Sequence, residues 1–137
     1  MHIATQLSIF LENRPGTLAE ICRTLAKAKI NIIAMTTSDA IDHAVDRLVL
    51  SEPKKAVRLF EERGVLVIET QVLVIEGSNL PGGLSQIAQS LGDARINIEY
   101  LYFATPPSSR SGVIILKCSN VKKAMHVLNR SKAKKRR

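Results

Sequence analysis

One segment of this 137-residue chain occurs twice, and this internal duplication restricts the possible folds more than any other feature. Residues 13–21, NRPGTLAEI, return as residues 79–87, NLPGGLSQI, at an offset of 66 positions (13 to 79). The offset extends to residues 48–50, which it aligns with residues 114–116, and it slips by two positions near the next helix. A unit of about 66 residues has therefore been duplicated in tandem.

Each copy has the order strand, helix, strand, strand, helix, and the first copy adds a final strand. Apolar patterning predicts strands at residues 3–11, 30–38, 47–50 and 65–69, and helices after Pro15 and after Pro53. The resulting βαββαβ order is the ferredoxin-like arrangement. We therefore predict an α+β fold with both helices of each unit on one face of an antiparallel sheet.

The two copies follow each other without a linker. Residues 65–69 run directly into the first strand of the second copy, residues 70–76, whereas freely jointed domains need a flexible connection. We therefore expect two sheets joined edge to edge, with a first unit at 1–69 and a second at 70–129. The second unit has no fourth strand of its own before a basic tail at 130–137, so that strand is missing or supplied from elsewhere.

The basic tail accounts for most of the net charge. The chain carries a formal charge of +8, and residues 130–137 hold six Lys and Arg with no acid, which leaves the rest near neutral. We expect a solvated, disordered end, because the tail has no apolar periodicity. Clustered cations also bind nucleic acid without reading its sequence, so a nucleic-acid-associated protein is the alternative function.

Composition favours a globular protein with a buried core. Apolar residues make up 45% and charged residues 23% of the chain. No apolar run is long enough to cross a bilayer, and the N-terminus lacks the regions of a secretory signal. Cys22 and Cys118 lie far apart in no metal or redox spacing, as in proteins of a reducing compartment. We predict a cytoplasmic protein without a membrane span.

The sequence contains no set of residues suited to catalysis. No Ser-His-Asp or Cys-His arrangement, phosphate-binding P-loop or GxGxxG motif is present, so we predict that the protein is not an enzyme and has no cofactor. Asp39, Asp42, His43 and Asp46 crowd one predicted hairpin and are a possible metal site. Their loose spacing specifies no coordination geometry, so we interpret them as a solvated turn and predict no metal.

The repeated turn between the first strand and first helix is the candidate binding feature. A helix N-terminus presents unpaired N–H groups and a partial positive charge, which can hold a carboxylate or phosphate. The glycine of each turn lets a ligand approach the backbone closely. Arg14 adds a cation that the second turn, with Leu80 at that position, lacks. The alternative interpretation is that Asn-x-Pro-Gly is only a good turn and cap.

These motifs resemble the signature of ACT domains, small ligand-binding modules that regulate amino-acid metabolism. Residues 13–18 with 29–32 carry the resemblance, and residues 79–84 with 96–98 repeat it. The family commonly binds a free amino acid at an interface between ACT units. Carried over position by position, the resemblance implies a site formed by Asn13, Arg14, Pro15, Gly16, Asn31, Ile32, Asn79, Leu80, Pro81, Gly82, Asn97 and Ile98. It implies a non-catalytic sensor of a free amino acid, with a regulated enzyme as a possible partner.

We also expect a homodimer or higher oligomer formed partly by the sheets. Strict alternation puts Ile33 and Met35, together with Leu101 and Phe103, on the sheet face without helices. Soluble monomers rarely expose such a patch, and a twofold-related copy would cover it.

Overall fold

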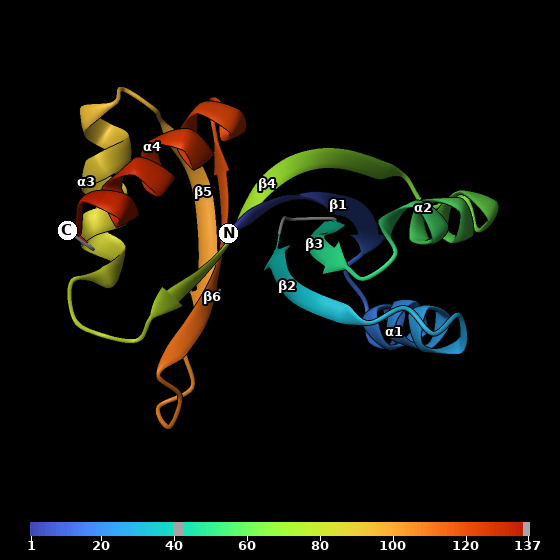
Figure 1. Ribbon diagram of the computed structural model, residues 1–137. Coiled ribbons are helices and arrows are strands. Elements are labelled where there is room, and N and C mark those ends of the chain that lie inside the picture. Colours follow the sequence, from blue (N-terminus) through green and yellow to red (C-terminus); the bar gives the residue numbers. More distant parts are fainter. Residues whose placement is uncertain (40–42, 136–137) are drawn as a thin grey trace. The chain divides into compact units, whose positions relative to one another are not determined.

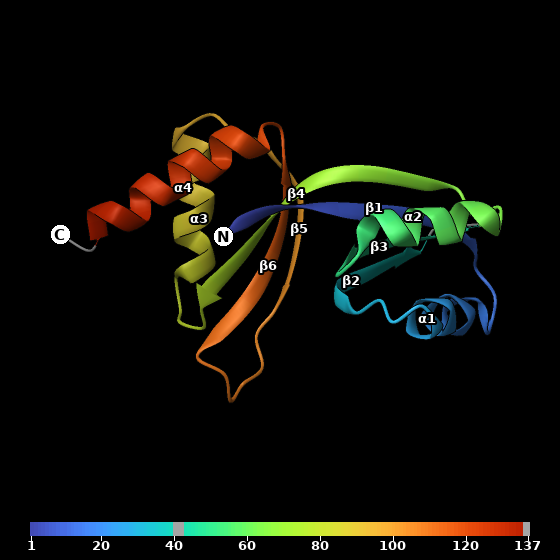
Figure 2. The same ribbon diagram turned by 45° about the vertical axis from the view of Figure 1, so that its right-hand side comes forward.

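A computed structural model describes residues 1–39 and 43–135 and divides them into two compact units (Figures 1 and 2). The N-terminal unit is Thr5–Thr70, and the C-terminal unit combines Met1–Ala4 with the chain from Gln71 onward. In each unit two helices cover one face of an antiparallel sheet. The predicted α+β, ferredoxin-like fold class is confirmed.

The N-terminal unit has the strand order β2-β3-β1-β4. Its elements are β1 (His2–Glu12), α1 (Thr17–Lys27), β2 (Ile32–Asp39), β3 (His43–Leu50), α2 (Pro53–Glu62) and the start of β4 (Val67–Ser78). Alternate β1 residues Leu7 and Ile9 pack against Leu25 of α1 and Phe60 of α2. The core forms because period-2 strand positions face the helical stripe of period 3.6.

The C-terminal unit has the order β1-β4-β6-β5. Its further elements are α3 (Gly83–Asp93), β5 (Ile98–Ala104), β6 (Ser111–Cys118) and α4 (Val121–Lys135). Its core repeats that of the first unit, with Leu73 and Ile75 of β4 packed against Leu91 of α3 and Leu128 of α4.

The first four residues supply the strand that the C-terminal unit lacks. Pairing of β1 with β3 begins at Gln6, so the start of β1 extends beyond its partner. Met1 and Ile3 pack instead against the core of the C-terminal unit. β4 passes from one unit into the other without interruption, as predicted. The expected first unit of 1–69 therefore differs from the structure, in which Met1–Ala4 belongs to the other unit.

The strand register corrects the alignment of the two copies. Leu7 pairs with Leu48 in the N-terminal unit, and Leu73 pairs with Leu116 in the C-terminal unit. Position 48 therefore corresponds to position 116 and not to 114. The physical reason is that the β5–β6 hairpin is two residues longer than the β2–β3 hairpin, so the slip occurs before the third strand.

A register shift in each unit reverses the predicted sidedness of β2 and β5. The ladder slips between Ile32 and Ala34, and again between Ile98 and Tyr100. Beyond these irregularities the alternation is displaced by one residue. Met35 and Leu101 consequently pack against the helix-covered cores, and Phe103 follows Leu101 onto the same face. The predicted placement of these three residues on the opposite face is wrong.

The basic tail is helical as far as the structure describes it. α4 continues to Lys135, so the prediction of disorder is wrong for residues 130–135, and residues 136–137 lie outside the described part. Lys, Arg and Ala favour helix, and cations near a helix C-terminus interact favourably with its dipole. In the described ranges, no helix combines the length and apolarity needed to cross a membrane.

Candidate ligand-binding site

The β1–α1 and β4–α3 loops share one backbone conformation. Gly16 and Gly82 have φ values of 90° and 86° and stand directly before α1 and α3. Residues with a side chain rarely adopt this left-handed conformation, so glycine is required for the turn. The N–H groups of a first helical turn have no intrahelical acceptor. At α3 these groups include those of Leu84 and Ser85, which are therefore available to an anion.

The asparagine that opens each loop holds it in place. Asn79 Nδ2 donates to the carbonyl oxygens of Ser109 at 2.9 Å and Pro106 at 3.3 Å, in the β5–β6 hairpin. Asn13 Nδ2 donates to Asp39 Oδ1 at 2.7 Å, at the end of β2. Because an amide nitrogen has two hydrogens, both donors of Asn79 are used. These asparagines position the loops, as the turn interpretation expects.

The other loop positions are exposed. Arg14 Nε lies 2.8 Å from Glu12 Oε2, and both side chains are solvent-exposed, so this cation already has an anionic partner. Pro15 and Pro81 are exposed, and Leu80 is 70% exposed beside the cavity described below.

The remaining predicted residues lie at the opposite end of each sheet. Asn31 and Ile32 stand at the start of β2, whereas Asn13 contacts Asp39 at its end, roughly 25 Å away at the rise of a strand. Asn97 and Ile98 occupy the same place at the start of β5. Within one unit, the structure therefore does not bring these residues together with the loop.

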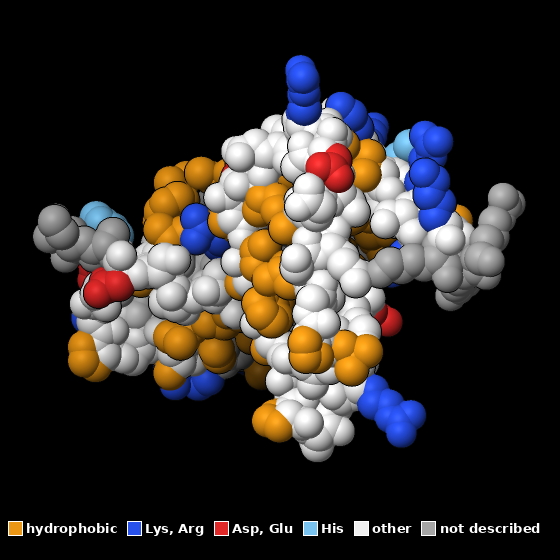
Figure 3. Space-filling view, turned by 90° about the vertical axis from the view of Figure 1, so that its left-hand side faces the viewer, with side chains coloured by type: hydrophobic (Ala, Val, Ile, Leu, Met, Phe, Trp, Pro, Cys, Tyr) orange, Lys and Arg blue, Asp and Glu red, His pale blue; other side chains and the backbone are white. Residues whose placement is uncertain are grey.

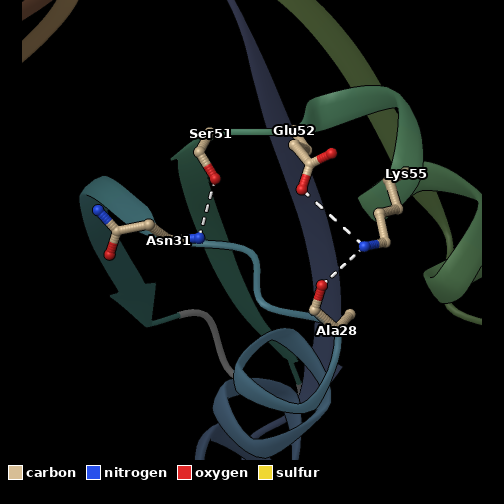
Figure 4. Close-up of polar contacts among 5 residues, drawn as sticks. All are labelled: Ala28, Asn31, Ser51, Glu52 and Lys55. Atoms are coloured by element: carbon tan, nitrogen blue, oxygen red, sulfur yellow. Dashed lines mark hydrogen bonds and ion pairs between the residues drawn. The ribbon is translucent and has the colours of Figure 1, made fainter.

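At that opposite end, polar contacts fix the connection from the first helix to the second strand (Figure 4). Asn31 N donates to Ser51 Oγ at 2.9 Å, and Lys55 Nζ donates to the carbonyl oxygen of Ala28 at 2.7 Å. In the C-terminal unit, Asn97 N donates to Ser119 Oγ at 3.2 Å and Lys123 Nζ to the Ala94 oxygen at 3.2 Å. The lysine satisfies a carbonyl that the helix end leaves unpaired, which is a structural role.

A cavity of about 400 Å³ lies in the C-terminal unit at the β4–α3 loop. Of the predicted residues, Asn79, Leu80 and Gly82 line it, whereas Pro81, Asn97 and Ile98 do not. The lining also includes apolar side chains, of which Leu84 and Ile87 belong to the repeated segment, whereas Phe103, Ile114 and Leu128 lie outside it. On the side of α3 and α4, hydrophobic side chains also reach the surface (Figure 3). The volume lies within the range of about 300–1,000 Å³ that is usual for small-molecule sites.

The titratable side chains of the described residues do not form a metal site. Among the residues that the structure describes, no three His, Cys, Asp or Glu side chains are grouped closely enough to hold a metal ion. Asp42 of the predicted hairpin cluster lies outside the described residues. Burial raises the pKa of the Cys118 thiol, so this side chain stays protonated near neutral pH and acts as an apolar core residue.

Known structures share this architecture. Protein BT0572 from Bacteroides thetaiotaomicron is 33% identical in sequence, with a TM-score of 0.88 over 95% of this chain and 89% of that one. The regulatory subunit of aspartate kinase from Thermus thermophilus is 17% identical, with a TM-score of 0.69 over 95% and 97% of the two chains. The corresponding subunit from Thermus flavus is 18% identical, with a TM-score of 0.63 over 95% and 96%. No curated protein sequence matches the chain.

The family model for the ACT domain pair matches residues 1–134. This match includes Met1–Ala4, the segment that completes the C-terminal unit. The chain belongs to the family of ACT domain pairs.

Proposed function

We propose that the protein is a non-catalytic regulator that binds a free amino acid in the cavity of its C-terminal unit. The observation that carries this proposal is that the cavity opens at the β4–α3 loop, the segment with the repeated family motif. The motif is defined by the repeat in the sequence, and its residues Asn79, Leu80 and Gly82 form one wall of the cavity. This placement favours the second copy as the binding unit.

The start of α3 supplies the chemistry for a carboxylate. The N–H groups of Leu84 and Ser85 carry the partial positive charge of a helix N-terminus, which stabilises a nearby anion by about 0.3–1 kcal/mol at an exposed site. Lys132 at the edge of the cavity adds a positive charge. The carboxylate of an amino acid would lie at α3, with its side chain directed into the cavity.

The proposed output is a change in a partner protein. Two similar structures are regulatory subunits of aspartate kinase, and they support the proposal that this chain also regulates an enzyme. A ligand has this effect when its affinity differs between the free and the partner-bound protein.

Isothermal titration calorimetry with the twenty amino acids tests the proposed function. Asn79→Ala frees the loop and should weaken binding about tenfold, because two hydrogen bonds that position the loop are lost. Asn97→Ala is the matched control: its side chain is exposed at the other end of the sheet, so binding should be unchanged. If Asn97→Ala abolishes binding and Asn79→Ala does not, the site is misplaced. Salt-sensitive RNA binding without amino-acid binding would support the nucleic-acid alternative.

We also propose that the chain forms a homodimer, on other residues than first predicted. Leu66, which immediately precedes β4, and Ile68 within it are 64% and 47% exposed, which is unusual for large apolar side chains so close together. Analytical ultracentrifugation at low micromolar concentration should give a dimer, and Ile68→Lys should shift it toward monomer. A wild-type chain that sediments only as a monomer contradicts this proposal.

A further inference from the structure

We infer that the cavity selects hydrophobic amino acids, an assignment of ligand class that rests on the function proposed above. The evidence is a comparison of the two copies within this one chain. Register and contacts make Gly77 the counterpart of Leu11, and Leu128 the counterpart of Phe60. Gly77 and Leu128 both line the cavity.

At Gly77 and Leu128, two positions of the cavity lining, the second copy carries smaller residues than the first. In the N-terminal unit, Leu11 is 8% exposed and Phe60 is completely buried, and both belong to the core. Replacing Leu by Gly and Phe by Leu removes about seven carbon atoms, whereas Phe103, at the position of Thr37, restores about four heavy atoms. The net loss is about three heavy atoms, and it is located at Gly77 and Leu128. Protein interiors are close-packed, so space of this size is unfavourable unless something fills it. The side chain of a ligand fits the space that the first copy fills with its own residues.

The walls favour an apolar occupant, because two part-buried hydroxyls in the lining, those of Ser90 and Ser131, bond to each other at 3.5 Å. Leu84, Phe103 and Ile114 come from three different elements and present hydrocarbon to the cavity. The charged side chains in the lining are Glu76 and Lys132, and both are solvent-exposed. No buried charge is therefore available in the lining to pair with a charged ligand side chain, which would lose its hydration without compensation. Valine, leucine, isoleucine, methionine and phenylalanine have suitable side chains.

Calorimetry on refilled variants tests this assignment. Gly77→Leu and Leu128→Phe restore the residues of the first copy, and a Cβ at Gly77 meets only Ile114 Cδ1, at an ordinary 3.7 Å. The double variant should lose at least tenfold in affinity for hydrophobic amino acids while its melting temperature stays the same or rises. Gly92→Ala is the matched control, since a Cβ there has no neighbour within 4 Å, and it should bind like wild type.

The outcomes separate the inference from the proposed function. If wild type binds serine, aspartate or lysine and no hydrophobic amino acid, the proposed function stands and the inference is wrong. If no amino acid binds at all, both are wrong. Hydrophobic ligands that bind the double variant as tightly as wild type would also overturn the inference. Leu128→Ala provides a test if the double variant does not fold. This substitution enlarges the cavity, so the binding preference should shift from valine toward phenylalanine. An unchanged preference contradicts the inference.

Discussion

We expect the C-terminal unit to melt at a much lower temperature than in the wild type when residues 1–4 are deleted and a new initiator Met precedes Thr5. Met1 and Ile3 pack against the core of that unit, and Met1–Ala4 provides its fourth strand. Both side chains are partly buried, so their loss should destabilise the unit by roughly 2–4 kcal/mol. For a unit of this size we expect a decrease in melting temperature of roughly 10–20 °C.

The chain contains built-in reporters for this experiment. Its two tyrosines, Tyr100 and Tyr102, lie on β5, and it has no tryptophan, so tyrosine fluorescence reports on the C-terminal unit alone. Cys118 is buried in the same unit and should become reactive toward thiol reagents as the unit opens. A chain that ends at Lys132 is the control, because the residues beyond it line neither the core nor the cavity and should leave the melting temperature unchanged. Equal melting temperatures for both truncations would contradict the assigned strand.

Gly112→Ala should be the most disruptive single substitution in the β5–β6 hairpin. A Cβ at Gly112 would overlap Thr105 Cγ2 and lie 2.8 Å from the carbonyl oxygen of Ala104. The threonine methyl can rotate, but the backbone carbonyl cannot move without distorting the hairpin. We expect destabilisation of about 1–3 kcal/mol, the usual range for an overpacked site.

The chain offers a matched control for this substitution. Gly77 pairs directly with Gly112 across the β4–β6 ladder, and a Cβ there makes only an ordinary contact. Gly77→Ala should therefore change the free energy of unfolding little or increase it slightly. Urea unfolding monitored by circular dichroism measures both variants. A Gly112→Ala protein as stable as Gly77→Ala would show that the hairpin does not approach as closely as described.

The duplication and the apolar periodicity were sufficient to predict the fold class. They could not predict the irregularities in β2 and β5. A bulge has no distinctive composition, yet it moves every side chain beyond it to the other face of the sheet. Nor could they assign Met1–Ala4, whose partner strand lies about 70 positions away. The basic tail was expected to be disordered for lack of an apolar stripe, although its residues have high helix propensity.

The candidate site was predicted only at its loop. Asn79, Leu80 and Gly82 of the repeated motif line a cavity, and their role in binding stays a prediction. The walls of the cavity could not be predicted, because Phe103 and Leu128 are ordinary apolar residues until packing places them. The sequence feature that points to the cavity is the change from Leu11 to Gly77 between the two copies. It can be recognised once the strands of the two copies are aligned by their register.

The most direct test of the account is a crystal structure of the full chain grown with a mixture of hydrophobic amino acids. The account predicts electron density for one amino acid in the cavity of the C-terminal unit. Its carboxylate should lie within hydrogen-bonding distance of the Leu84 and Ser85 N–H groups, and its side chain should lie beside Gly77 and Leu128. An amino acid bound at the Asn31 or Asn97 end of a sheet, with the cavity unfilled, would contradict it.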